Sequence, residues 1–413
     1  MPPDEASEDL GEPTLIECPD CSAMQLIKPI SSGRLQCRRC GNTLERATGR
    51  SITAALACGA ATLILLFPAN LLPLLHFSYA GIESGTRVPD GIVFLWHEGW
   101  VLAAAVVALQ VMILPFFRFG LLIVALEAIR VRSERRWIGP CFRWAEKLDP
   151  WAMPDVFLIG CAIGYSRIAP YAPVFVDDGG WCMIGAAFMA MMTRASLDRR
   201  YVWKRLPPIS TVSPLADHIV CTVCDLMIAA MAEGGRCPRC GQRVWRRKPF
   251  AATYAAALTL AAFLLLPLAY LYPMSSFSSP FVHTSHTIFD GVRDLVNAGL
   301  WPLACLVFTA SIAIPLAKLA GMSWFLFSLK TRSARRLTAK ARAYRVIDDL
   351  GRWSNIDVYT IAVFTPMVQF GQLASFHAGI GTPAFLAIVV LTMLASEAFD
   401  PRLLWDCAGP ING

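Results

Sequence analysis

The stretch Cys18-Pro19-Asp20-Cys21, followed by Cys37-Arg38-Arg39-Cys40-Gly41, guides the interpretation of the whole chain. The same arrangement returns as Cys221-Thr222-Val223-Cys224 and Cys237-Pro238-Arg239-Cys240-Gly241. Each Cys-x-x-Cys pair can wrap a tight turn around a metal ion, and two pairs supply the four ligands of a tetrahedral site. A glycine after the second pair suits a turn that requires positive φ. The pattern therefore predicts two small metal-binding ribbons.

The ribbons are expected at residues 15–46 and 216–246. The predicted ligands are Cys18, Cys21, Cys37 and Cys40 in the first and Cys221, Cys224, Cys237 and Cys240 in the second. Four thiolates leave no position for water, so each site is expected to be closed and structural. We expect two Zn²⁺ ions, with iron in a rubredoxin-like site as the second choice because it uses the same ligands. A dithiol redox role is a further alternative, although ribbons this small could not bury a core without a metal.

The composition indicates a membrane protein. Of 413 residues, 55% are hydrophobic and 16% are charged, which is too apolar for an ordinary soluble protein. The formal net charge of +7 fits basic cytoplasmic loops better than nucleic-acid binding. No Walker A, H-E-x-x-H or glycine-rich dinucleotide motif occurs, and we do not expect an enzyme. Residues 1–14 are acidic and contain proline, which predicts a disordered tail rather than a signal peptide.

Eight apolar stretches are long enough to cross a bilayer as helices. They are residues 52–75, 92–126, 152–173, 180–197, 250–273, 297–328, 356–376 and 382–398. The second is too long for one straight span, so its first part is expected to be interfacial or re-entrant. Lysine and arginine gather in loops on one side, such as residues 127–150 and 330–345. Cytoplasmic loops attract these residues, so both ribbons and both chain ends are expected to face the cytoplasm.

The two halves of the chain also match beyond the cysteines. Matching pairs include Asp90 with Asp290, Pro115 with Pro315, Arg118 with Lys318, Trp151 with Trp353, Asp155 with Asp357, and Asp198 with Asp400. The offset is 200 residues in the first three pairs and 202 in the last three. We expect an all-α membrane protein of two tandem four-helix modules, residues 50–205 and 249–406, each preceded by a small cytoplasmic zinc ribbon with four cysteine ligands. An even number of spans gives both modules the same orientation, which makes a parallel repeat.

Four charged residues in or beside these spans are the candidates for transport chemistry: Arg118, Asp155, Lys318 and Asp357. A charge inside a bilayer costs about 2.5–3.5 kcal/mol on insertion scales, so each instance requires a reason. We infer that Arg118 pairs with Asp155, and Lys318 with Asp357, across neighbouring helices. The alternative is that these side chains only reach toward the interface or cap helices, which requires no function.

Two phrases carry a resemblance to a known family. Pro68-Ala69-Asn70-Leu71-Leu72-Pro73 follows the first ribbon, and residues 391–406, from Leu391 to Asp406, close the second module. With the doubled cysteine quartets, they resemble the paraquat-inducible protein A family of bacterial inner-membrane proteins. The resemblance covers nearly the whole chain. The second module departs from it with Pro267-Leu268-Ala269-Tyr270, and the closing phrase of the first module is degraded, so the modules are not expected to be equivalent.

The resemblance implies a part in lipid traffic between the inner and outer membranes of Gram-negative bacteria. We expect an inner-membrane component that passes phospholipid-like amphiphiles to or from a periplasmic mammalian-cell-entry domain protein. The implied partners are that protein and membrane phospholipid, with no nucleic acid. A membrane scaffold or stress-response protein whose ribbons dock cytosolic partners is an alternative, and a thiol or iron redox membrane protein is another.

Overall fold

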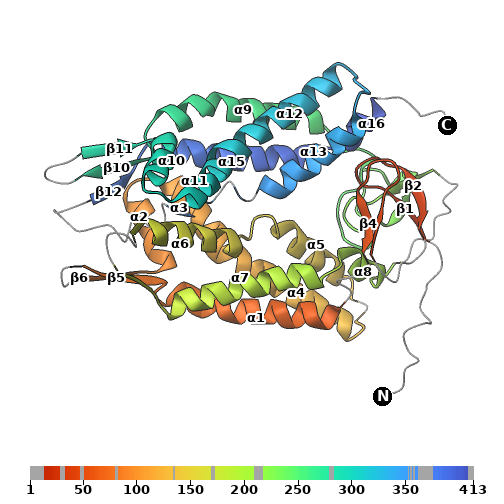
Figure 1. The fold of residues 1–413 in the computed structure, drawn as a ribbon. Coiled ribbons are helices and arrows are strands. Elements are labelled where there is room, and N and C mark those ends of the chain that lie inside the picture. The colour runs from red at the N-terminus through yellow and green to blue at the C-terminus, as the bar shows by residue number, and fades with distance from the viewer. Residues whose placement is uncertain are drawn as a thin grey trace.

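The chain folds into two helical bundles that lie side by side, with short strands at both ends (Figure 1). The computed structural model describes residues 14–27, 33–46, 51–79, 82–133, 135–168, 173–208, 217–278, 283–351, 353, 356, 359–360 and 375–407. Each bundle corresponds to one predicted repeat.

The first bundle, called module 1, follows the first ribbon. Its helices are α1 (Ile52–Leu71), α2 (Val88–His97), α3 (Val101–Val107), the π-helix η1 (Ala108–Ile113), α4 (Leu114–Arg130), α5 (Ile138–Leu148), α6 (Pro154–Ile168), α7 (Asp178–Ser196) and α8 (Arg199–Lys204). α1 begins after Ser51, whose side chain accepts a hydrogen bond from the Ala54 backbone N–H at 3.1 Å. α1 then packs against α7 and α4, which forms the centre of the module.

The second bundle, module 2, repeats this order. Its helices are α9 (Ala251–Leu271), α10 (Ile288–Asn297), α11 (Trp301–Phe308), the π-helix η3 (Thr309–Ala313), α12 (Ile314–Lys330), α13 (Leu337–Leu350), α15 (Gly381–Ala398) and α16 (Arg402–Asp406). α15 packs along α9 as α7 packs along α1. In both modules a π-helical segment comes just before the proline, Pro115 or Pro315, that opens the following helix. π-helices are rare and are often found at functional sites.

Within the described ranges, five helices are long and apolar enough to cross a membrane. They are Ile52–Leu71, Val101–Arg130, Ala251–Leu271, Trp301–Lys330 and Gly381–Ala398, and Pro154–Ser166 is a shorter apolar helix. α7 occupies the position of the predicted fourth span but is less apolar than these five, and most of the predicted span 356–376 lies outside the described residues. The chain is therefore a multi-pass membrane protein, and the count of eight spans stays a prediction.

The predicted second and sixth spans each begin later than expected. α2 ends at His97 and α10 at Asn297, and the chain turns through Gly99 (φ +84°) and Gly299 (φ +76°) before the long helix begins. Glycine suits both turns because positive φ strains other L-residues. The stretch 92–126 is thus divided, with a separate short helix in its first part, and the interfacial or re-entrant placement of that part stays a prediction.

Each module also contains a three-stranded antiparallel sheet, which the all-α prediction missed. The strands are β5 (Leu75–Tyr79), β6 (Ile82–Thr86) and β7 (Val174–Val176) in module 1, and β10 (Ser275–Ser278), β11 (His283–His286) and β12 (Ser375–Ala378) in module 2. Both sheets lie at the end of the molecule opposite the ribbons (Figure 1). In module 1 the His76 Nδ1 lies 2.6 Å from the Asp177 Oδ1, which fastens β5 to the start of α7.

The modules meet through residues that are equivalent in the repeat. The rings of Phe157 and Tyr359 are 5.7 Å apart, and their sequence positions differ by the repeat offset of 202. The buried Tyr359 hydroxyl donates to the Gln110 Oε1 at 2.7 Å. A Cβ at Gly160 would lie 2.8 Å from the Tyr359 Cβ, so glycine permits this close approach. Phe157 and Tyr359 are equivalent residues of the two modules, so their contact lies close to the axis that relates the modules. One apolar core is shared by both modules there.

The ribbons are built from short antiparallel hairpins. Ribbon 1 contains β1 (Thr14–Glu17), β2 (Met24–Ile27), β3 (Arg34–Gln36) and β4 (Thr43–Arg46), and ribbon 2 contains β8 (His218–Val220) and β9 (Met227–Ala229). In ribbon 2 an isolated bridge between Arg236 and Arg243 stands where ribbon 1 has β3 and β4. Each hairpin holds one Cys-x-x-Cys turn between its two arms.

Candidate functional site

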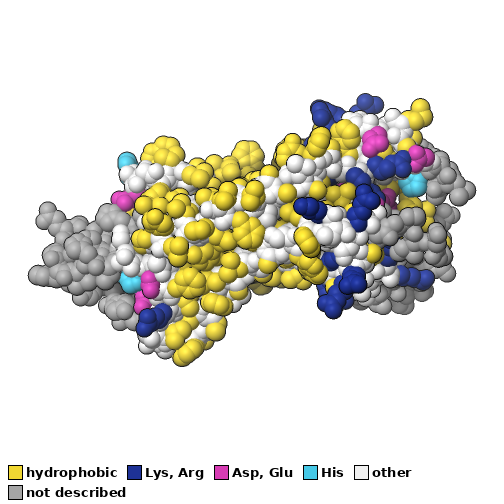
Figure 2. Space-filling model, turned by 90° about the horizontal axis from the view of Figure 1, so that it is seen from above, with side chains coloured by type: hydrophobic (Ala, Val, Ile, Leu, Met, Phe, Trp, Pro, Cys, Tyr) yellow, Lys and Arg dark blue, Asp and Glu magenta, His cyan; other side chains and the backbone are white. Residues whose placement is uncertain are grey.

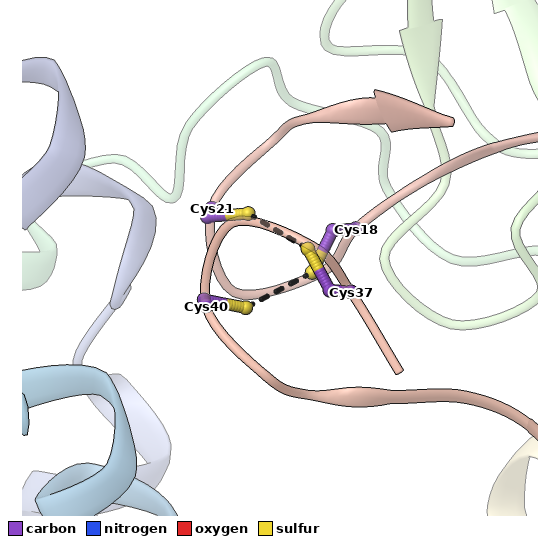
Figure 3. Close-up of side chains that lie close together, drawn as sticks. All are labelled: Cys18, Cys21, Cys37 and Cys40. Carbon is purple, nitrogen blue, oxygen red and sulfur yellow. Dashed lines mark hydrogen bonds between the residues drawn. The ribbon is translucent and has the colours of Figure 1, made fainter. Parts of the chain in front are cut away.

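The four cysteines of ribbon 1 converge on one point (Figure 3). The Sγ atoms of Cys18 and Cys40 are 3.5 Å apart, and those of Cys21 and Cys37 are 3.6 Å apart. All four sulfur atoms lie within 4.8 Å of one another and are buried. Zinc–sulfur bonds of about 2.3 Å in a tetrahedron place neighbouring sulfur atoms roughly 3.8 Å apart. The spacing therefore fits a single tetrahedral metal ion.

Two backbone turns set this convergence. The Ser22 N–H donates to the Cys18 carbonyl at 2.9 Å, and the Gly41 N–H donates to the Cys37 carbonyl at 2.8 Å. Gly41 has positive φ, as predicted for the glycine after the second pair, and Ser22 after the first pair has positive φ as well. The Gln25 amide also donates to the Cys37 Sγ at 2.8 Å, which supplies a hydrogen bond to a ligand sulfur.

Ribbon 2 repeats the same geometry. The Sγ atoms of Cys221 and Cys240 are 3.6 Å apart, those of Cys224 and Cys237 are 3.5 Å apart, and all four lie within 4.8 Å of one another. Both predicted quartets are thus brought together. Each cluster could hold one metal ion.

A second group of charged residues lies near the ribbon end of module 1. The Arg118 Nη2 is 2.5 Å from the Asp149 Oδ1, and Arg118 is almost fully buried. Arg194 on α7 lies 2.9 Å from Asp149 and 2.7 Å from Asp155. The predicted residues Arg118 and Asp155 therefore belong to one network, joined through Asp149 and Arg194. Asp149 and Arg194 were not predicted from the sequence, because each stands at or beside the end of a helix, where a charged residue is common.

Module 2 does not repeat the network. Lys318 is 1% exposed, and its Nζ has no hydrogen-bond partner within the described part of the chain. A Cβ at Gly351 would lie 3.0 Å from that Nζ. At the repeat offset of 202, Gly351 stands where module 1 has Asp149, and Ser396 stands where it has Arg194. The predicted partner of Lys318, Asp357, lies outside the described residues.

One acidic residue on α13 interacts with this region. Burial raises the pKa of the Asp348 carboxyl, while a hydrogen bond with Ser396 and the charge of Lys318 partly oppose the rise. Asp348 is thus near enough for its charge to act on Lys318, but it comes from α13 rather than from the position of Asp149. The two modules therefore surround equivalent cations in different ways.

A known protein family matches the chain twice, once in each module. The profile of the family described as paraquat-inducible protein A matches residues 52–207 and again residues 253–408. The chain belongs to the paraquat-inducible protein A family. The two matched segments correspond to the two modules, so the structural repeat is also a repeat of the family unit.

This chain matches curated relatives over nearly its whole length. It is 27% identical over 405 residues to "Intermembrane transport protein PqiA" of Escherichia coli (strain K12), covering 95% of each chain. It is 27% identical over 402 residues to "Lipophilic envelope-spanning tunnel protein A" of the same strain, covering 97% of this chain and 93% of the relative. It is 24% identical over 406 residues to "Probable intermembrane transport protein" of Haemophilus influenzae, covering 95% of each. No solved structure matches the chain.

Proposed function

We propose that this chain is the inner-membrane component of an intermembrane lipid-transport system. It would pass phospholipid-like amphiphiles to or from a periplasmic mammalian-cell-entry domain protein. The observation that carries the proposal is the match, over at least 93% of both chains, to relatives named for intermembrane transport and for an envelope-spanning tunnel. The apolar spans supply the membrane part of such a system.

The proposed orientation puts the ribbons and both chain ends in the cytoplasm. Figure 2 shows hydrophobic side chains over the middle of the visible face and most lysine and arginine side chains near the ribbon end. Positively charged residues are favoured on the cytoplasmic side of inner-membrane proteins. The two small sheets would then face the periplasm, where the mammalian-cell-entry partner would bind.

The two cysteine clusters are proposed to hold Zn²⁺. The near-tetrahedral spacing of the sulfur atoms and the all-thiolate ligand set support a structural ion in each ribbon. Bound zinc would hold the hairpins of a ribbon folded and would leave no open position for catalysis. Metal analysis of the purified protein should give two zinc ions per chain and a colourless solution. An iron–thiolate absorbance would contradict this assignment.

Transport chemistry is proposed to centre on Lys318, with Asp357 as its partner and Arg118 and Asp155 as the matching residues of module 1. A buried ammonium group can hold an anionic lipid head group or exchange a proton with a carboxylate. Because Gly351 takes the place of Asp149, no acid from that position neutralises Lys318. The proposal is therefore that Lys318 is kept available for its ligand.

The decisive experiment is lipid transfer between reconstituted vesicles, with and without the mammalian-cell-entry partner. The wild-type chain should accelerate transfer only with the partner, and Lys318→Met or Asp357→Asn should abolish it while the protein remains folded. Gly351→Asp should also abolish transfer, since it places a carboxylate beside the Lys318 Nζ. Arg118→Met makes the equivalent change in module 1 and shows whether transfer depends on that module as well.

If both Lys318→Met and Asp357→Asn transfer lipid at the wild-type rate, the charge-pair mechanism is wrong. If the wild-type chain binds its partner and moves no lipid under any condition, the chain is a scaffold. Copurification of lipid with the wild-type chain would supply an independent measure of the ligand.

A further inference from the structure

Each ribbon docks on the module that it does not precede in the sequence. In ribbon 1, Asp20 forms an ion pair with Arg345 of α13 at 2.6 Å, and the Cys40 carbonyl accepts a hydrogen bond from the same guanidinium at 3.0 Å. The Arg39 guanidinium lies 4.6 Å from the centre of the Trp405 ring on α16. Ribbon 1 thus rests on module 2, about 300 residues away in the chain.

Ribbon 2 docks in the same way on module 1. The Arg143 Nη1 on α5 donates to the Gln242 Oε1 at 3.3 Å, and a Cβ at Gly139 would overlap the Arg239 carbonyl. Arg143 and Arg345 are separated by the repeat offset of 202, so equivalent arginines receive the two ribbons. Figure 1 shows ribbon 1 beside α13 and α16 of module 2, and also beside α8 of module 1, where Lys204 lies 3.3 Å from Glu45 of the ribbon.

The apolar contacts follow the same crossed pattern. One cluster of buried residues joins ribbon 1 to module 2, from Ile27 and Leu44 to Ala341 and Phe399. A separate cluster joins ribbon 2 to module 1, from Ile219 to Phe142. The four cysteines of each ribbon belong to the cluster of the opposite module. The apolar packing around each metal cluster is therefore supplied by the opposite module, whereas the contacts of ribbon 1 with α8 of module 1 are polar.

We propose that each ribbon, with its metal bound, is the clamp that orders the cytoplasmic helix of the opposite module: ribbon 1 orders α13, and ribbon 2 orders α5. The proposal rests on the metal content proposed above. Arg345 binds the carbonyl of a ligand cysteine and the aspartate between two ligands, so the turn that it recognises exists only when the ribbon is folded. By thermodynamic reciprocity, the docking of α13 must in turn tighten the metal of ribbon 1.

Ligand replacement tests the crossed pattern in the full-length protein. Cys40→Ser removes a ligand from ribbon 1, and Cys240→Ser is the matched change in ribbon 2. Amide hydrogen exchange is then measured over α13 (Leu337–Leu350) and α5 (Ile138–Leu148). Cys40→Ser should accelerate exchange in α13 and leave α5 unchanged, and Cys240→Ser should do the reverse. Acceleration in the module that follows the altered ribbon, or in neither helix, overturns the proposal.

A second pair of variants leaves the ligands of the tested ribbon intact. In the Cys240→Ser background only ribbon 1 holds metal, and Arg345→Gln should release it to a chelator about 10-fold faster, as expected for loss of a group that supports a ligand. Arg143→Gln in the Cys40→Ser background is the matched test of ribbon 2. Unchanged release in both overturns the proposal.

Metal content distinguishes failure of the proposed zinc sites from failure of the proposed clamp. A chain that holds no metal overturns both this proposal and the proposed zinc sites. A chain that holds two ions and lacks the crossed exchange pattern overturns only the clamp, and leaves the proposed transport function as it stands.

Discussion

Because of Glu146, the stability of the protein is expected to depend on pH. It lies on α5, where its side chain is 14% exposed. Its carboxylate forms an ion pair with Arg199 at 2.9 Å and accepts a hydrogen bond from the Trp203 indole at 3.1 Å. We predict that Glu146→Gln stabilises the protein at alkaline pH and has little effect in acid.

The magnitude follows from the pKa of Glu146, which is raised from 4.5 to about 7. Burial is the main cause; Arg199 and Trp203 oppose it, and the charges of Asp225 and Asp149 add to it. The folded state therefore holds the proton more tightly than the unfolded state. The associated stability is complete below pH 4.5 and is lost as the pH rises through about 7. At roughly 1.4 kcal/mol per pKa unit, the full loss is about 3 kcal/mol.

Glutamine is neutral at every pH and can still accept the hydrogen bond from Trp203. The lost pair with Arg199 costs little, since Arg199 is 52% exposed and exposed pairs contribute about 0–1 kcal/mol. The free energy of unfolding should therefore be about 2–3 kcal/mol higher for Glu146→Gln than for wild type at about pH 8, and the difference should shrink to about 1 kcal/mol or less at about pH 5.

The assay is unfolding of the purified protein in detergent across about pH 5–8.5, an interval that covers most of the titration. Glu127→Gln on α4, where the carboxylate is 40% exposed, is the matched control and should run parallel to wild type. A difference between Glu146→Gln and wild type that stays constant with pH would refute the reasoning, because it would show that Glu146 does not titrate in this interval.

Three further substitutions test contacts described above. Gly139→Ala should destabilise the protein by about 1–3 kcal/mol in thermal unfolding, despite the higher helix propensity of alanine, because its Cβ overlaps the Arg239 carbonyl; a stabilised variant would show that α5 and ribbon 2 do not touch there. Tyr359→Phe should cost about 1–2 kcal/mol in unfolding by sodium dodecyl sulfate, and Gln110→Leu added to it should recover most of the loss; independent effects would argue against the hydrogen bond. Arg194→Met should cost about 3–5 kcal/mol by the same assay because it leaves two carboxylates beside one remaining guanidinium, and a neutral result would contradict the network.

The metal clusters could be predicted from the sequence because their geometry is local. A Cys-x-x-Cys pair and its turn lie within a few residues, and the turn after each second pair requires the positive φ found at Gly41 and Gly241. The internal repeat could be predicted as well, from the matching residues of the two halves. Each depends on the short-range conformation of the chain or on direct comparison of its halves.

The sheets and the crossed ribbons could not be read in this way. β5 pairs with β7 across about 100 residues, and those strands are only five and three residues long, too short for an alternating pattern to stand out. Ribbon 1 finds Arg345 through tertiary packing that leaves no periodic signal in the sequence. The pairing of Arg118 was expected with Asp155, and the ion pair that forms is with Asp149, because two acids that flank the same helix start are indistinguishable without coordinates.

The difference between the modules bears most directly on function. Relative to module 1, module 2 has exchanged Asp149 for Gly351 and Arg194 for Ser396, so one negative and one positive charge are missing together. This double exchange leaves the sum of charges unchanged and removes both bridging groups of the network. A buried cation that lacks these bridging groups costs stability, which the charge of Asp348 offsets only in part, and we propose that Lys318 is retained for transport. Restoring only the acid with Gly351→Asp should therefore stabilise module 2 and abolish transport. A variant that gains stability and keeps transport would show that transport does not require an unbridged charge on Lys318.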